Sequence, residues 1–395
     1  MVVTLGYAEA VDEEFGREVF SSKIGGKPRW LDPTRPLAVN RVVCDECTKP
    51  MVLLMQLYAP EDEPASAFHR TLYVFICRSG ACHKAGAKQC MRVFRSQLAE
   101  ENSVYEEDAS SNDVSDNNDD DDDITWALRP QVKAAPLCVV CGLAGTKGCS
   151  KCRARLYCSR DHQLADWSGG HREQCGSGKT DNAAHRRKLQ RMVFPEYVIV
   201  SEEEPAQAQA EAEAFGEDSD DDGEDTEGIT AEDMALVPVS GERAEDSSVD
   251  VDRAFLMFQR RIQLSPDQVI RYARSAESPG PSEPLFVSDD GRPSIGADAN
   301  ADVPACEKCS AAREFELQIM PQMLNFLSID SVDPASIDWG TLLIYTCPKS
   351  CDSAGYAGEV ICRQNFSSQG IGEKFMRAMH GDDSGFTKQF DSLNI

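Results

Sequence analysis

The sequence predicts an α+β fold, in which a strand-rich domain made of two duplicated halves is interrupted by a small cysteine-rich module and acidic disordered linkers. Three observations lead to this prediction. A Cys-x2-Cys pair, an apolar run, a β-rich run and a second cysteine pair follow one another before residue 100 and again after residue 300. Eight cysteines and histidines crowd into residues 138–175, and acidic residues are concentrated on both sides of this segment.

Residues 1–100 are predicted to form the N-terminal half. VVTLGYAE alternates like a strand, and Pro28 and Pro33 bias the residues before them away from helix. The β-type runs MVLLMQLYAP and FHRTLYVFIC each have a cysteine pair at one end. The metal shell expected here consists of Cys44, Cys47, Cys77 and Cys82. His83 and Cys90 are alternative ligands, and free core cysteines are the competing interpretation.

Residues 252–395 are predicted to form the C-terminal half. CEKCSAAREFELQIMPQML and DWGTLLIYTCPKSC repeat the order of the first half, with 41 residues between the first and second pairs against 33. The metal shell expected here consists of Cys306, Cys309, Cys347 and Cys351. DRAFLMFQRRIQ fits an amphipathic helix, and Ser265 and Pro266 fit the start of another. PLFVS and EVICRQNF are predicted strands, Cys362 an ordinary buried thiol, and order is expected to fade after about Met379.

Two acidic segments, residues 101–128 and 201–251, are predicted to be disordered linkers. Glu100 to Asp123 contains twelve acidic and no basic residues, and Ser201 to Asp250 contains nineteen acidic residues against one base, Arg243. Such segments cannot bury enough apolar surface to offset the entropy of ordering. They act either as solvated spacers or, within a chain of net charge −27, as an attractive field for a basic partner.

The inserted module, residues 129–185, contains four ligand pairs. They are spaced C-x2-C, C-x2-C, C-x3-H and H-x3-C, which suits two tetrahedral zinc ions with Zn–S distances of about 2.3 Å. With interleaved pairs the first shell is Cys138, Cys141, Cys158 and His162, and the second is Cys149, Cys152, His171 and Cys175. Sequential pairing is the rival arrangement. Metal-type spacing without an apolar signal peptide favours zinc over disulfides, and full shells make the zinc structural rather than catalytic.

The surroundings of this module reverse the charge of the chain. Arg129 to Arg191 carries thirteen basic and four acidic residues, but no stacking aromatics are interleaved with them, so nucleic-acid binding is not expected. Within residues 186–200, RMVFPEYVIV is predicted to be a strand that returns to the core. No apolar run reaches the roughly 18 residues of a membrane span, so we expect a soluble protein.

The spacing of the module and its Tyr157-Cys158 pair resemble the MYND zinc finger. His162 stands where MYND fingers usually have cysteine, and imidazole binds zinc equally well. The resemblance implies binding of short, often proline-containing peptides.

Further blocks resemble the programmed cell death protein 2 family: LGYAE, SKIGGKPRWLDP, QLYAP, FHRTLYVFIC, VFRSQL, FPEYVIV, PLFVS, MPQML and DWGTLLIYTC. The likeness implies a duplicated α+β domain. It also implies a dedicated chaperone for one basic small-subunit ribosomal protein, S-two of the universal S-five group, which supports assembly of the 40S subunit.

We therefore expect a non-enzymatic, monomeric holdase in the cytoplasm, with some presence in the nucleus. A client segment would add as a strand to a groove or sheet edge. The aromatic residues that could line such a groove, or else belong to the core, are Trp30, Tyr58, Phe68 and Trp339. The alternative function is a nuclear MYND adaptor in transcriptional regulation; a RING-type ubiquitin ligase is a third and less favoured reading.

Overall fold

The computed structural model describes residues 3–12, 19–108, 125–177, 182–205, 252–274, 283–296, 301–329, 333 and 335–366. These residues fall into two compact units. The first contains residues 1–203, 267–284 and 291–365, and the second contains residues 204–266, 285–290 and 366–395. Residues 109–124 and 206–251, which make up most of the predicted linkers, and the tail after Met379 lie outside the described residues.

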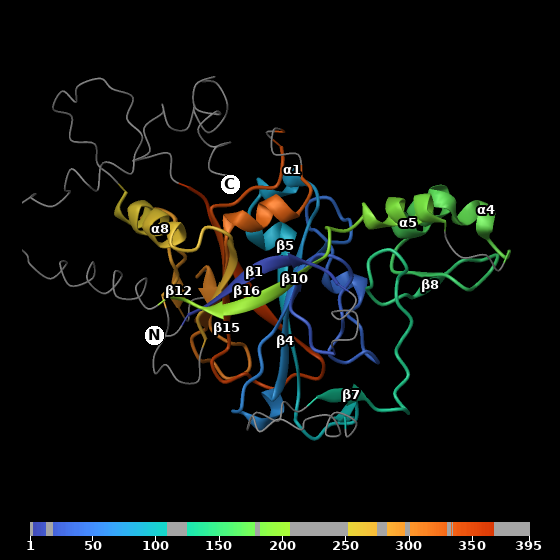
Figure 1. Cartoon of the computed structure of the whole chain (residues 1–395), viewed down its shortest axis with the longest axis horizontal. Helices are drawn as coiled ribbons and strands as arrows, with labels where there is room; N and C mark the ends of the chain where they lie inside the picture. Colours follow the sequence, from blue (N-terminus) through green and yellow to red (C-terminus); the bar gives the residue numbers. More distant parts are fainter. Residues whose placement is uncertain are drawn as a thin grey trace, which may run out of the picture. The chain divides into compact units, whose positions relative to one another are not determined.

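The first unit is built on a closed ten-stranded barrel (Figure 1). Every neighbouring pair in the ring is antiparallel. The order around the ring is β1 (Thr4–Ala10), β10 (Tyr197–Glu203), β2 (Lys23–Ile24), β3 (Val52–Tyr58), β4 (His69–Ile76), β5 (Met91–Leu98), β16 (Tyr356–Gln364), β15 (Thr341–Thr346), β14 (Glu314–Ile319) and β11 (Gln268–Tyr272). The predicted strand-rich fold is confirmed, and strands from both sides of the inserted finger share one sheet.

The two cysteine-bearing stretches occupy matching positions in the ring. One contributes β2 to β5 and the other contributes β11 and β14 to β16, and the two runs meet where β5 pairs with β16. Both β3 and β14 contain a bulge, at Leu54 and at Glu316. Each bulge lies ten residues after the first cysteine of its stretch, Cys44 or Cys306.

The central strands are buried on both faces. All eight residues of β4 and six of the seven in β3 are buried, because the barrel interior covers one face and loops and the finger cover parts of the other. Their β-branched, aromatic and long aliphatic side chains suit such a position. Trp339 is one per cent and Trp30 six per cent exposed, so both belong to the core.

Three small sheets and several short helices complete the described chain. The sheets pair β6 (Tyr105–Glu107) with β7 (Trp126–Leu128), β8 (Lys147–Gly148) with β9 (Leu156–Tyr157), and β12 (Ile295–Gly296) with β13 (Val303–Pro304). The α-helices are α1 (Gly80–His83), α2 (Ala87–Cys90), α3 (Arg160–Asp166), α4 (Arg172–Gln174), α5 (Ala183–Gln190) and α8 (Arg253–Gln263). The other helical turns are η2 (Val39–Arg41), η3 (Ala65–Ala67), η5 (Trp167–His171) and η6 (Pro321–Phe326).

Two predictions for the C-terminal half are wrong. The segment after Ser265-Pro266 forms strand β11 rather than a helix, because the β-branched pair Val269 and Ile270 is buried in the barrel and β11 pairs with β1 and β14. PLFVS, residues 284–288, has no strand pairing. The helix predicted before Ser265 is confirmed as α8.

The ends of the predicted linkers are ordered. Residues 105–107 and 126–128 pair as β6 and β7, and Ser201 to Glu203 extend β10. The strand predicted over Arg191 to Val200 begins only at Tyr197, because residues 191–196 form a turn and an irregular stretch in which Pro195 has no N–H to donate to a neighbouring strand.

The second unit is described through α8 and its neighbours. The side chain of Asp252 caps the helix by accepting from the Phe255 N–H at 3.1 Å, and it also accepts from the Ser288 hydroxyl at 2.6 Å. Phe258 packs edge-on against Phe366. One face of the amphipathic helix is thereby buried, as its sequence pattern predicts.

Candidate metal centres

The structure brings sixteen predicted ligands together as four clusters. In each cluster the ligand atoms of four residues lie within 4.8 Å of one another. The clusters are Cys44, Cys47, Cys77, Cys82; Cys138, Cys141, Cys158, His162; Cys149, Cys152, His171, Cys175; and Cys306, Cys309, Cys347, Cys351. In the finger the grouping follows the interleaved order and not the sequential one. His83 and Cys90, the alternative ligands, lie outside the first cluster: the His83 ring contacts the Cys77 carbonyl at 2.8 Å, and the Cys90 thiol contacts the Gly86 carbonyl at 3.2 Å.

Every Cys-x2-Cys pair adopts the same backbone turn. The fourth residue after the first cysteine donates its N–H to the carbonyl of that cysteine, at 2.8 to 2.9 Å. This residue has a positive φ in all four turns: Thr48 58°, Gly142 76°, Arg153 56° and Ser310 58°. Three of them are not glycine, so the turn holds a conformation that L-residues rarely adopt. The turn directs the two thiols of each pair toward one point.

The distances between ligand atoms fit zinc. A tetrahedral ion with Zn–S bonds of about 2.3 Å places its sulfurs about 3.8 Å apart, whereas a disulfide needs about 2.05 Å. The sulfur pairs Cys47–Cys77, Cys141–Cys158 and Cys149–Cys175 lie 3.6, 3.5 and 3.8 Å apart. In the fourth cluster the distances are 3.6 Å for Cys309–Cys347 and 3.7 Å for Cys347–Cys351. The clusters therefore suit structural zinc, and all of the cysteines are free.

In the barrel, strand ends position the two outer clusters. The first cysteine pair precedes β3 and the second follows β4, within or just before α1. The same order recurs around β14 and β15. Since β3 pairs with β4 and β14 with β15 in antiparallel register, each hairpin brings its two pairs to one end.

In the finger, hydrogen bonds to one buried carboxylate hold the ligand-bearing helices. Ser159 caps α3 by accepting from the N–H of His162, which places that ligand in the first turn. Asp166 is fully buried and accepts from Arg155 at 2.9 Å and from the Tyr157 hydroxyl at 2.7 Å. Its Oδ1 also lies 2.8 Å from Nε2 of His185 in α5. The network ties α5 to the metal-binding part of the finger.

The finger packs on the barrel unit through its first knuckle. The indole N–H of Trp30 donates to the Gly142 carbonyl at 2.8 Å, and the N–H of Ala144 donates to the Leu37 carbonyl at 3.0 Å. A Cβ at Gly142 would come within 2.9 Å of the Lys27 side chain, and the positive φ there independently favours glycine. Trp30 therefore joins the finger to the barrel and does not line a groove for an extended segment.

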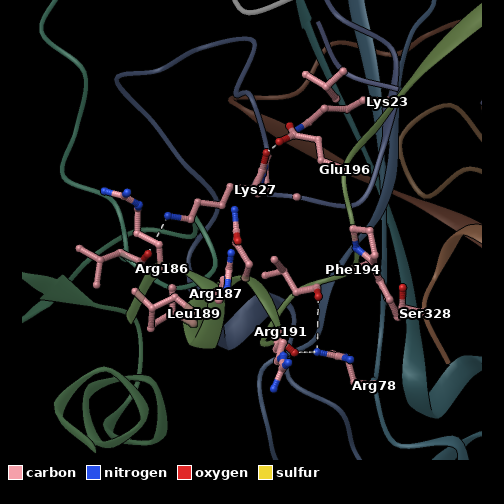
Figure 2. A pocket seen from close by; sticks show the side chains of 18 of the residues that line it. Lys23, Lys27, Arg78, Arg186, Arg187, Leu189, Arg191, Phe194, Glu196 and Ser328 are labelled. Atoms are coloured by element: carbon pink, nitrogen blue, oxygen red, sulfur yellow. Dashed lines mark hydrogen bonds and ion pairs between the residues drawn. The ribbon is translucent and has the colours of Figure 1, made fainter. Parts of the chain in front are cut away.

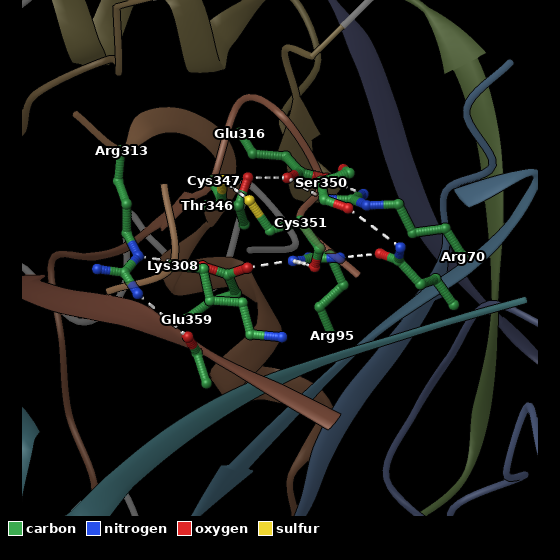
Figure 3. Close-up of polar contacts among 12 residues, drawn as sticks. Arg70, Arg95, Lys308, Arg313, Glu316, Thr346, Cys347, Ser350, Cys351 and Glu359 are labelled. Carbon is green, nitrogen blue, oxygen red and sulfur yellow. Dashed lines mark hydrogen bonds and ion pairs between the residues drawn. The ribbon is translucent and has the colours of Figure 1, made fainter. Parts of the chain in front are cut away.

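Sequence reasoning missed two buried ion-pair networks in the barrel (Figure 3). Arg70 of β4 and Glu316 of β14 are both fully buried and form two hydrogen bonds, of 2.5 and 2.6 Å. These strands are not neighbours in the ring, so the pair spans the barrel interior. Burial opposes ionisation of Glu316, but Arg70 outweighs it and lowers the pKa of Glu316 to about 2.

The second network joins Arg95 of β5 to Glu359 of β16 at 2.9 Å, and Arg313 adds a contact to the same carboxylate at 3.1 Å. Arg95 also donates to the Cys351 carbonyl at 3.1 Å, which links the network to the fourth cluster. No local pattern marks these residues, because each partner lies more than a hundred positions away or on another strand.

A barrel with two cysteine clusters and an inserted finger with two more defines a zinc-finger protein of the MYND type, whose finger is a protein-interaction module. The family models for the N-terminal and C-terminal domains of programmed cell death protein 2 match residues 2–112 and 252–367, and the MYND finger matches residues 138–175. The chain belongs to the programmed cell death protein 2 family, as its sequence blocks predict.

Relatives support this membership. Programmed cell death protein 2 of Bos taurus is 34% identical over 92% of this chain and 96% of its own length. Programmed cell death protein 2-like of Homo sapiens is 26% identical over 84% of this chain and 85% of its own. The probable 20S rRNA accumulation protein 4 of Schizosaccharomyces pombe is 30% identical over 30% of each chain. No solved structure matches.

The family is not a known enzyme family. Among the described residues, no helix combines the length and the apolar character that crossing a bilayer requires.

Proposed function

We propose that this protein is a dedicated, non-catalytic chaperone that holds one basic small-subunit ribosomal protein, S-two of the universal S-five group, and supports assembly of the 40S subunit. The observation that carries the proposal is charge. The chain has a net charge of −27, and both acidic stretches leave from the barrel unit, one between β6 and β7 and one after β10. A ribosomal protein away from RNA needs such a counter-charge. The name of the Schizosaccharomyces pombe relative, which refers to 20S rRNA, points in the same direction.

The closed barrel changes how a client would dock. Each of the ten strands pairs with a neighbour on both sides, although β2 pairs through only two residues with β3 and two with β10, so none of the described barrel strands is an edge strand open to strand addition along its length. Client binding is therefore assigned to the acidic stretches and to the outer surface of the barrel, rather than to an added strand.

The architecture in this proposal is a barrel of two duplicated halves that holds two structural zinc ions, with two more in the inserted finger. Equal bulge offsets and matching strand order support the duplication. The sixteen clustered residues named above would be the zinc ligands, each shell being complete without water. A monomer in the cytoplasm, with some in the nucleus, completes the proposal.

Purification of the tagged full-length chain from cells at low salt, with mass spectrometry of bound proteins, tests the client. One basic ribosomal protein should co-purify and should be lost when the acidic residues of 206–251 are replaced by their amides. Retention of the client by this variant at every salt concentration would remove the electrostatic part of the proposal. A matched variant, in which the same number of neutral residues of this stretch are replaced by asparagine or glutamine, controls for the number of substitutions.

The match to the MYND finger favours a second candidate, an adaptor that recruits partners through proline-containing peptides in the nucleus. Disabling the finger with His171→Ala and Cys175→Ala separates the two. Loss of every partner favours the adaptor, whereas a retained ribosomal client favours the chaperone.

A further inference from the structure

A basic cavity lies where the finger, α5 and the barrel loops of the first unit meet. It has a volume of about 1500 Å³, larger than the roughly 300–1,000 Å³ of small-molecule pockets. Its charged lining consists of one acidic residue, Glu196, and eight basic residues, namely Lys23, Lys27, Arg29, Arg78, Arg155, Arg186, Arg187 and Arg191. Figure 2 shows basic side chains from the barrel loop and from α5 around one space. Within a chain of net charge −27, this strongly positive cavity is a candidate site for a negatively charged ligand.

The charges of the cavity are only partly neutralised within the protein. Lys23 is buried and bonded to Glu196, and Lys27 donates to the Val139 carbonyl at 2.6 Å. Arg187 and Arg191, at the end of α5 and just beyond it, are exposed and carry their charge toward solvent. Glu196 pairs with Lys23, and Arg155 pairs with Asp166 of the finger. Among the described residues, no carboxylate pairs with Arg187 or Arg191.

Arg78 belongs to the cavity lining and is an exposed residue. It donates to the backbone carbonyls of Arg191 and Val193, and its guanidinium lies 5.3 Å from the centre of the Phe194 ring. Within the described part of the chain no carboxylate pairs with Arg78, and partial burial lowers its pKa. An anionic group brought beside it would offset this desolvation.

Apolar side chains complete the lining. Among the apolar residues of the lining, Val11 is exposed and Val139 and Pro195 are half-buried, whereas Leu189, Val193 and Leu327 are buried beneath the surface. Phe194 is an aromatic side chain of the lining, but it is one per cent exposed and lies under Arg78, so it offers no face on which a base could stack. A ligand that combines carboxylates with apolar side chains fits this lining better than a nucleic acid does.

We propose that this cavity binds an acidic peptide segment of a partner protein, with carboxylates on Arg187, Arg191 and Arg78 and an apolar residue against Val139 and Pro195. This site differs from the site of the basic client, because the positive charge of the cavity would repel a basic protein. The protein would thus hold two partners of opposite charge at separate places, and the basic face of the finger is the acidic partner's site.

Fluorescence anisotropy of the full-length, zinc-loaded chain with a fluorescein-labelled peptide of the repeat Asp-Glu-Leu tests the proposal. The amide counterpart, Asn-Gln-Leu, is the uncharged control peptide. Arg187→Glu with Arg191→Glu should weaken binding about tenfold, which corresponds to about 1.4 kcal/mol. Arg160→Glu with Arg172→Glu changes the net charge equally on exposed finger positions outside the cavity, and should leave the affinity within about twofold.

Zinc content and thermal melting establish that each variant is folded. If the charge-reversal variant Arg187→Glu with Arg191→Glu does not fold, the milder pair Arg187→Gln with Arg191→Gln takes its place. Equal weakening by both variant pairs, or equal binding of both peptides, would overturn the proposal. So would tighter binding of an oligouridylate through Arg187 and Arg191, which would make the site one for RNA. Peptide binding that appears only after the acidic residues of 217–227 are neutralised would show the chain's own acids to be the occupant.

Discussion

Removing one partner of the Arg70–Glu316 pair should destabilise the barrel far more than removing both. Neither side chain is exposed, and two hydrogen bonds of 2.5 and 2.6 Å join them. Breaking a buried pair leaves an uncompensated charge and costs about 3–5 kcal/mol. Because Glu61 lies 3.4 Å from Arg70, and Arg274 lies 3.5 Å from Glu316, we expect the lower end, about 3 kcal/mol, for Arg70→Met and for Glu316→Gln.

The double variant Arg70→Met with Glu316→Met should cost about 2 kcal/mol or less, rather than the roughly 6 kcal/mol sum of the single changes. It leaves Glu61 and Arg274 paired with each other at 2.6 Å, so no buried charge is left alone. Shape and volume are approximately kept by methionine.

Urea unfolding of zinc-loaded protein, followed by intrinsic fluorescence, measures these differences. The matched control is Arg92→Met. Arg92 lies 2.8 Å from Asp45, whose side chain is exposed, so this substitution should cost under about 1 kcal/mol. Single-variant costs as small as that of Arg92→Met, or a double variant that costs the full sum, would refute the argument from burial.

The remaining predictions concern metal, pH and the finger. Metal analysis should find about four zinc ions per chain and three in Cys306→Ser, and two zinc ions in the wild type would confine the metal to the finger. A chelator should unfold the finger, because each zinc site contributes about 10 kcal/mol to its folding. Burial lowers the pKa of His69 to about 4, so the contribution of His69 to the free energy of unfolding is complete above about pH 6.5 and declines toward pH 4. His69→Phe should flatten this part of the curve of stability against pH, and an unchanged curve would contradict the prediction. Asp166→Asn should destabilise the finger by about 2–3 kcal/mol and lower hydrogen-exchange protection in α5, since Tyr157 and His185 lose a charged acceptor; equal protection would count against the network.

The sequence predicted all four candidate metal sites because ligand spacing is a local property. A Cys-x2-Cys pair fixes its own turn, so the four knuckles need no tertiary information. The cysteines of the first cluster also bracket two strands whose pattern is visible, and their meeting follows from antiparallel pairing. His83 was an open alternative only because spacing cannot decide which of two adjacent side chains faces the metal.

Ring order and buried charge could not be predicted, because they depend on contacts between distant residues. The helix expected after Pro266 shows the limit well. Ser265 and Pro266 give a good helix start, but Val269 and Ile270 gain more by filling a barrel position between β1 and β14. Arg70 and Glu316 lie 246 positions apart, and nothing near either residue predicts the other.

The position of β10 and β11 on either side of β1 bears on how the chain can be synthesised. During vectorial translation β1 emerges first, yet its two neighbours follow only after the finger and, for β11, after residue 266. Until then β1 and β5 carry unsatisfied hydrogen-bonding edges, which invite aggregation of a nascent chain. A chain released before β11 is made would therefore hold an open sheet of six strands with β1 and β5 as its unpaired edges, and synthesis of the remaining four strands removes these edges.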